Sequence, residues 1–171
     1  MASETFQPLV FFVKMVLMVV LLSVDAFWNS SNEYDDYGTN VQLAFGAQLF
    51  IQIFVFIVLF LILTDTYPFQ IGLLSELLED FKPVLGCHPV YVVFTGALGI
   101  WRMTIIGDGV TSVMVLWRRR SYAAVSVVHK LVAIAYYLLN MRATLRLGRP
   151  LYYQREYWVG RHSGKKPTHA H

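Results

Sequence analysis

Charged residues are scarce in this sequence, and their scarcity excludes most water-soluble folds. They make up 15% of the 171 residues, whereas a soluble domain carries about 25%. Apolar residues make up 56% of the chain, and the mean hydropathy is +0.50. So little charge cannot cover a water-facing surface. A soluble enzyme, a disordered linker and a nucleic-acid-binding module are therefore poor interpretations, and we expect no nucleic acid as a partner.

Cysteine is almost absent, and the residue patterns of known catalytic sites are missing. The single Cys87 excludes an intrachain disulfide framework and a zinc site built from cysteines. No Ser-His-Asp set falls at one depth of a span, and no span holds a pair of acids. The segment 160–165, GRHSGK, is one residue short of a phosphate-binding loop. We therefore expect no enzymatic activity, no catalytic residues, no metal and no cofactor.

Four long apolar segments are present instead. About 20 apolar residues cross the roughly 30 Å hydrocarbon core of a bilayer. The predicted spans are residues 8–28, 43–63, 89–117 and 121–141. The second span is the clearest, since its only polar side chains are Gln48 and Gln52. A cleaved secretory leader is the alternative for the first span, but no Lys or Arg precedes its apolar run.

The segment between the second and third spans is too charged to cross a membrane. Residues 68–82 place apolar side chains on one helical face and acidic side chains on the other, which is typical of an amphipathic helix. Because it joins two spans, we expect it to lie in the membrane interface. Pro83, Gly86 and Pro89 are predicted to end this helix before the third span begins.

The distribution of Lys and Arg predicts the orientation and completes the fold. With a cytosolic N-terminus, nine of these residues flank the spans on the cytosolic side, and only Arg118–Arg120 lie outside. Both termini are therefore predicted to be cytosolic. The fold class is an all-α membrane protein: a four-span bundle over residues 1–141 with one interfacial helix, and a basic, aromatic cytosolic tail over residues 142–171.

Five charged or polar residues in the spans are candidate contacts: Lys130, His129, Arg102, Asp25 and Asp108. Lys130 lies near the middle of a span, where a charge costs at least ~2.5 kcal/mol. We interpret it as a structural contact, and the alternative is an acid on a partner chain. His129 points about 100° away round the helix and is expected to be a hydrogen-bonded packing residue. Arg102 has two interpretations, a pair with Asp25 or Asp108 and a place at the outer interface.

The tail interleaves arginine with aromatic residues, a pattern that suits anionic lipid or other membrane proteins as partners. Its candidate contacts are Arg146, Arg149, Tyr152, Tyr153 and Trp158.

A sequon, Asn29-Ser30-Ser31, follows the first span on the outer side of the membrane. Asn29 is therefore a candidate glycosylation site.

Several short motifs, in order, resemble one known family. FQ-x-GL covers residues 69–73, and RLG-x-P-x-x-Y covers residues 146–153. LLSVDAFWNS closes the first span, and a long motif beginning HKLVAIAYYLLN closes the last. Over residues 21–158 these motifs resemble the transmembrane protein 138 family of small four-span proteins. The arginine triplet at 118–120 and the His-ended tail depart from the family pattern.

The resemblance implies a non-enzymatic, multi-pass protein of the ciliary membrane or ciliary base. It implies a scaffolding or trafficking role in cilium biogenesis at the transition zone, exerted through protein–protein interaction. The residues themselves leave two alternatives. One is an accessory subunit of a large respiratory or channel complex, with the acid for Lys130 on a neighbouring subunit. The other is a small transporter or lipid-handling protein with a cavity around Lys130, His129 and Arg102.

Overall fold

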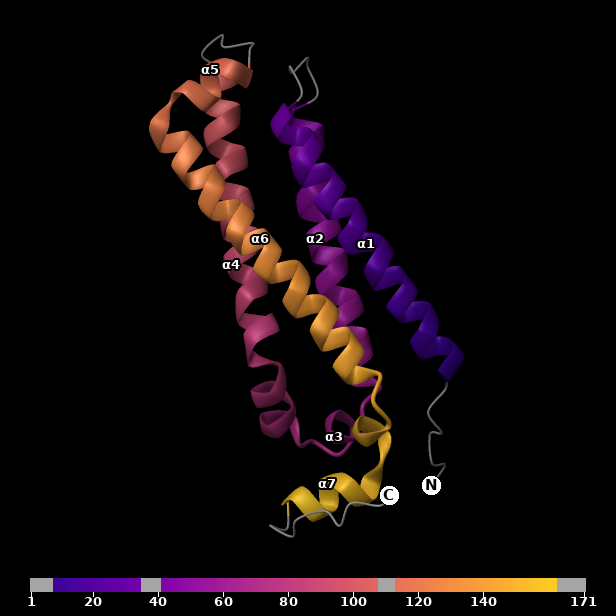
Figure 1. The fold of residues 1–171 in the computed structure, drawn as a ribbon. Coiled ribbons are helices and arrows are strands. Elements are labelled where there is room, and N and C mark those ends of the chain that lie inside the picture. The colour runs from indigo at the N-terminus through magenta and orange to yellow at the C-terminus, as the bar shows by residue number, and fades with distance from the viewer. Residues whose placement is uncertain (1–7, 35–40, 108–112, 163–171) are drawn as a thin grey trace.

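Four long helices dominate the computed structural model, which describes residues 8–34, 41–107 and 113–162 (Figure 1). The long helices are α1 (Pro8–Tyr34), α2 (Val41–Thr64), α4 (Leu74–Gly107) and α6 (Arg120–Leu147). Each contains a stretch long and apolar enough to cross a membrane, and the described residues include no strand. The predicted class, an all-α membrane protein with four spans, is confirmed.

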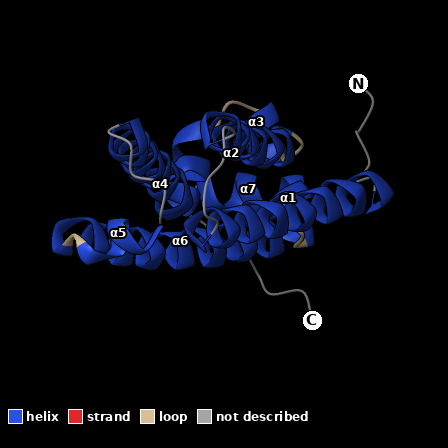
Figure 2. Cartoon of the chain, turned by 90° about the horizontal axis from the view of Figure 1, so that it is seen from above, coloured by secondary structure: helices blue, strands red, loops and turns tan. Residues whose placement is uncertain are grey.

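Four short elements connect or follow the spans: α3 (Tyr67–Gln70), α5 (Val113–Arg118), the 3-10 helix η1 (Pro150–Tyr153) and α7 (Arg155–His162). Helix α1 packs along α2, α4 packs along α6, and α2 contacts both α4 and α6 (Figure 2). Because successive long helices alternate in direction, α3, α7 and the start of α1 lie at one end of the bundle, and α5 lies at the other (Figure 1).

The buried residues of α4 and α6 recur at alternating steps of four and three. On α4 they are Leu77, Phe81, Val84, His88, Tyr91, Thr95, Leu98, Arg102 and Ile105. On α6 the same spacing selects Tyr122, Ser126, His129, Ala133, Tyr136, Asn140, Ala143 and Leu147. A seven-residue repeat keeps one face of a helix against its neighbour over many turns. The opposite faces expose large apolar side chains such as Val93 and Leu131, as a lipid-facing surface requires.

Helix α4 runs without a break through the prolines that were predicted to end an interfacial helix. Pro83 and Pro89 both lie inside it, so the predicted boundary before the third span is wrong. Each proline removes one backbone donor, but the buried repeat crosses both without losing register. In hydrocarbon, a full break would leave more backbone groups without partners than the two prolines do.

The predicted interfacial segment at residues 68–82 is therefore divided between two elements. Its first residues form α3, a turn follows, and the rest forms the first turns of α4. Gly72 makes this turn with φ +80°, a left-handed conformation that glycine adopts without the steric cost of a side chain.

Other predicted boundaries shift as well. Helix α1 continues to Tyr34, six residues beyond the predicted end of the first span, and α6 continues to Leu147, six residues into the predicted tail. Of the predicted third span, α4 covers the residues up to Gly107 and α5 begins at Val113, and residues 108–112 lie outside the described residues. Asp108 lies outside the described residues.

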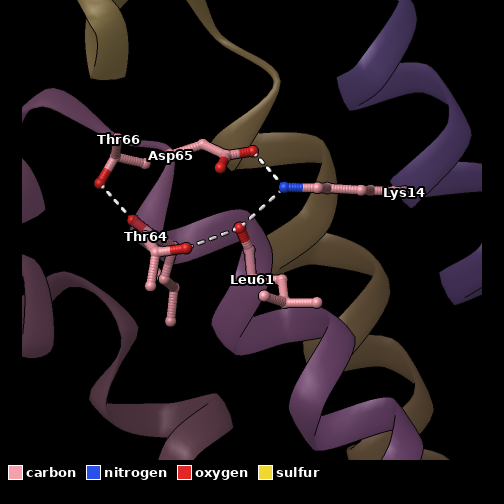
Figure 3. Close-up of polar contacts among 6 residues, drawn as sticks. Lys14, Leu61, Thr64, Asp65 and Thr66 are labelled. Carbon is pink, nitrogen blue, oxygen red and sulfur yellow. Dashed lines mark hydrogen bonds and ion pairs between the residues drawn. The ribbon is translucent and has the colours of Figure 1, made fainter.

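A charged clip joins α1 to the end of α2 (Figure 3). The Lys14 ammonium binds the Asp65 carboxylate at 2.5 Å and the Leu61 carbonyl at 3.1 Å. Thr66 is buried next to this pair and donates its hydroxyl to the Leu63 carbonyl at 2.7 Å. The charge that interrupts the first apolar run is therefore partnered within the chain.

We expect Gly99→Ala to destabilise the bundle, because α2 and α4 touch at this glycine. A Cβ at Gly99 would lie 2.1 Å from Cε2 of Phe45. Overpacking of this kind costs about 1–3 kcal/mol. The measurement is thermal unfolding in detergent, followed by circular dichroism.

Gly96→Ala is the matched control, since nothing lies within 4 Å of its added Cβ on the same helix. It should leave the melting temperature unchanged or raise it slightly, because alanine favours helix over glycine. In a Phe45→Ala background, Gly99→Ala should cost nothing further. Equal losses for Gly96→Ala and Gly99→Ala would contradict the close approach.

Candidate functional site

Asp25 on α1 is fully buried and forms the centre of a polar network that joins the four long helices. Its Oδ2 atom accepts hydrogen bonds from the hydroxyls of Tyr91 on α4 and Tyr137 on α6, each at 2.9 Å. Its Oδ1 atom accepts from the side-chain amide of Gln52 on α2 at 3.4 Å. One carboxylate therefore gathers donors from each of the other three long helices.

The network extends from Gln52 through Thr95 to His129. The Gln52 amide donates to Thr95 Oγ1 at 3.1 Å, and Thr95 Oγ1 lies 3.0 Å from His129 Nε2. The imidazole also stacks on the ring of Tyr91, with 5.4 Å between ring centroids. His129 thus sits as a hydrogen-bonded packing residue between α4 and α6.

Lys130 contacts α1 of its own chain, where the alternative interpretation expected an acid on a partner chain. Its ammonium donates to the backbone carbonyl of Asn29 at 2.9 Å and approaches the Asn29 side-chain oxygen at 3.4 Å. The amide nitrogen of Asn29 donates in turn to the Tyr91 hydroxyl at 3.4 Å. Lys130 and Asp25 therefore enter one network through Asn29 and Tyr91.

The placement of Asn29 corrects the expectation of glycosylation. Its side chain is only 7% exposed, and its amide nitrogen, the atom that would carry a glycan, contacts Tyr91 inside the bundle. The sequon pattern records residue types but not burial, which is why it pointed to the wrong role.

Arg102 lies at a small cavity lined by residues of all four long helices. It is 8% exposed and lines a cavity of about 50 Å³ together with Gln48, Thr95 and His129. This volume has room for a few water molecules. The donors on Asp25 come from Tyr91, Tyr137 and Gln52, so a pair with Asp25, part of one of the two interpretations of Arg102, is not formed.

The candidate tail residues separate into buried and exposed groups. Tyr152 and Trp158 are buried, against the expected surface role: the indole N–H of Trp158 donates to the Leu151 carbonyl at 2.9 Å, and Tyr152 packs on Phe81 of α4. The elements that carry them, η1 and α7, both contact α3 at this end of the bundle. Arg149 is exposed on the same end.

Arg146 ties the end of α6 to the start of α4. Its guanidinium pairs with the Asp80 carboxylate at 3.2 Å and donates to the Asp80 backbone carbonyl at 3.3 Å. It also lies 5.6 Å from the centroid of the Phe81 ring. Tyr152 adds a weak hydrogen bond to the same carboxylate at 3.4 Å.

Tyr153 is half-buried at the same end of the molecule. Burial raises the pKa of Tyr153 to about 12, and the nearby Asp65 carboxylate adds to the rise. Burial likewise raises the pKa of Tyr152, next to Asp80.

Four members of the network were not among the predicted site residues: Gln52, Tyr91, Thr95 and Tyr137. Gln52 is one of two polar side chains in the clearest span, and Tyr91 and Thr95 fall on the seven-residue repeat of α4. That repeat is the feature of the sequence that could have identified them as interior residues. It can be recognised only when polar residues, as well as apolar ones, are counted as buried positions.

The network can hold helices together, and its chemistry suits that task. An acid in hydrocarbon is costly unless its oxygens are hydrogen-bonded. The groups that donate hydrogen bonds to Asp25, and those that accept hydrogen bonds from Lys130, lie on other helices of the same chain. Each of these contacts therefore fixes one helix relative to another.

Comparisons with known proteins agree on one family. A family model described as Transmembrane protein 138 matches residues 41–162. The chain is 31% identical over 144 residues to "Transmembrane protein 138" of Mus musculus, covering 84% of this chain and 87% of the relative. It is 30% identical over 154 residues to "Transmembrane protein 138" of Xenopus tropicalis, covering 90% and 93%. No solved structure matches the chain significantly.

We expect Tyr137→Phe to lower the free energy of unfolding by about 1–2 kcal/mol, because it removes one donor from a buried carboxylate. In an Asp25→Asn background the same substitution should cost less than half as much, since the two residues act as a pair. Unfolding in detergent measures all four combinations. Ser23→Ala, an exposed hydroxyl on α1, is the control and should stay within about 0.5 kcal/mol. A loss at Tyr137 that is independent of residue 25 would refute the pairing.

The raised pKa of Tyr153 predicts a loss of stability at high pH. The unfolded chain releases this proton near pH 10 and the folded chain near pH 12, so stability is complete below pH 10 and falls as the pH rises to 12. Tyr153→Phe should make this decrease in stability smaller. The measurement is the melting temperature of each protein from pH 9 to pH 12. Tyr157→Phe controls for the loss of a hydroxyl on the same segment. Identical pH profiles for the wild type and Tyr153→Phe would disprove the assignment.

Proposed function

The chain belongs to the transmembrane protein 138 family, and we propose that it serves cilium assembly as a structural, scaffolding or trafficking component of the transition zone. The ciliary part of the proposal rests on the family resemblance. The non-enzymatic, structural part rests on the geometry of the bundle. Its partners in this proposal are other membrane proteins, and both of its termini are cytosolic.

One observation carries the structural part: two charged groups inside the membrane, Asp25 and Lys130, are bound by the chain's own helices. Asp25 is bound by Tyr91, Tyr137 and Gln52, and Lys130 is bound to Asn29. A transport pathway needs polar groups that a solute can reach. Groups already engaged between helices instead favour a fixed bundle that presents its outer surface to partners.

The end of the bundle that carries α3 and α7 is the surface we propose for those partners. It stands outside the apolar stretches of the long helices, and the Arg146–Asp80 pair and the buried Trp158 hold it in place. A surface held in one conformation loses little entropy when a partner binds. The exposed Val159 lies on its α7.

The geometry gives less support to the two alternatives, an accessory subunit of a large complex and a small transporter or lipid-handling protein. Lys130 has acceptors on α1 of its own chain, so it does not call for an acid on a neighbouring subunit. The cavity near Arg102 and His129 has a volume of about 50 Å³, far below the roughly 300–1,000 Å³ typical of small-molecule sites.

The test is replacement in ciliated cells that lack their own family member. An N-terminally tagged chain should restore cilia, lie at the ciliary base and crosslink to membrane proteins there. Val159→Asp on the exposed face of α7 should reduce crosslinking while leaving the protein in the membrane, and Arg118→Gln at the opposite end is the control. Mitochondrial signal with one stoichiometric complex, or solute transport by the purified chain, would overturn the proposal.

A further inference from the structure

We propose that the groove at the end of α6 binds the headgroup of an anionic glycerophospholipid, of which phosphatidylserine is the representative. The groove is open to the surface, has a volume of about 660 Å³, and is lined by Leu138, Met141, Arg142, Leu145, Arg146 and Arg149. The proposal does not depend on a ciliary role.

The position of the groove along α6 matches the edge of a bilayer. Arg120 and Arg142 are 22 residues apart on one helix, which corresponds to about 33 Å at 1.5 Å per residue. The hydrocarbon core is about 30 Å thick. If Arg120 marks one edge of the core, Arg142 therefore lies at the other, where lipid phosphates are found.

One stripe of α6 alternates the two chemistries that a phospholipid needs. Leu138, Arg142 and Leu145 follow one another at steps of four and three, so they share a face of α6. Arg149 lies just beyond the end of the helix and lines the same groove. Leu138 is 66% exposed and Leu145 is 61% exposed. An acyl chain can lie along the leucines while a phosphate and a carboxylate reach the guanidinium groups.

Asp80 shapes the charge of the groove. It pairs with Arg146 and lines the adjoining cavity of about 200 Å³ between α4 and α6. The pair neutralises Arg146 and also fixes its position at the groove wall. Arg142 and Arg149, both exposed, supply the net positive charge, which complements an anionic headgroup and not a zwitterionic one.

The arginine triplet at the opposite end offers an internal comparison. Arg118, Arg119 and Arg120 are all exposed, at the corner between α5 and α6. Removing two charges there changes the net charge of the protein as much as removing Arg142 and Arg149. Comparing substitutions at the two ends of α6 therefore distinguishes binding in a specific groove from a general attraction between a basic protein and acidic lipid.

The test is titration of the purified full chain in detergent with dioleoyl phosphatidylserine or dioleoyl phosphatidylcholine, with bound lipid counted by native mass spectrometry. We expect phosphatidylserine to bind more tightly. Each basic residue near a membrane surface adds roughly fivefold to affinity, so Arg142→Gln/Arg149→Gln should weaken phosphatidylserine binding about 25-fold. Arg118→Gln/Arg119→Gln should change it less than twofold.

Two further arms keep the result decisive. Soluble glycerophosphoserine should not compete at the same concentration, because it lacks the acyl chains that contact Leu138 and Leu145. Should the Arg142/Arg149 variant lose its helical circular dichroism, the salt dependence of the wild type replaces it: binding should weaken from 50 to 500 mM salt. Equal affinity for the two lipids, equal losses at both ends of α6, competition by the soluble headgroup, or binding insensitive to salt would each overturn the proposal.

Discussion

A carboxylate in hydrocarbon needs hydrogen-bond donors on every side, and this requirement at Asp25 organises the bundle. The donors come from α2, α4 and α6, so the acid can be satisfied only when all four long helices have their observed neighbours and register. A shift of one helix by a single turn, about 5.4 Å, would remove a donor. The surrounding packing is therefore specified by a polar contact and not by apolar shape alone.

The interior of the bundle combines apolar and polar side chains, and its outer faces are apolar. In lipid, apolar side chains gain little from leaving their surroundings, so helix association depends on packing and hydrogen bonds. The buried repeats of α4 and α6 accordingly include His88, Thr95, Ser126 and Asn140 among their members. The Lys14–Asp65 clip and the Arg146–Asp80 pair act at the end of the bundle that carries α3 and α7, where polar contacts again join separate helices.

Apolar run length was enough to predict four spans, because crossing hydrocarbon is a requirement that each segment meets alone. It also identified Asp25 and Lys130 as interior residues, since a charge is conspicuous in such a run. It failed at Pro83 and Pro89, where local propensity suggested a break but the continuous buried face maintains the helix. It could not find Tyr91 or Tyr137 as the partners of Asp25, because pairs separated by 66 and 112 positions depend on how the helices assemble.

The same sequence separations bear on biosynthesis. A ribosome delivers α1 and α2 first, when only Gln52 is available to Asp25, then Tyr91 with α4, and Tyr137 last with α6. A nascent chain that stops before α6 thus keeps an incompletely bonded acid within the bilayer. The carboxylate's set of donors is complete only once α6, the last of the long helices, has been inserted, so a chain cut before α6 differs from the finished molecule by an acid that is short of a donor.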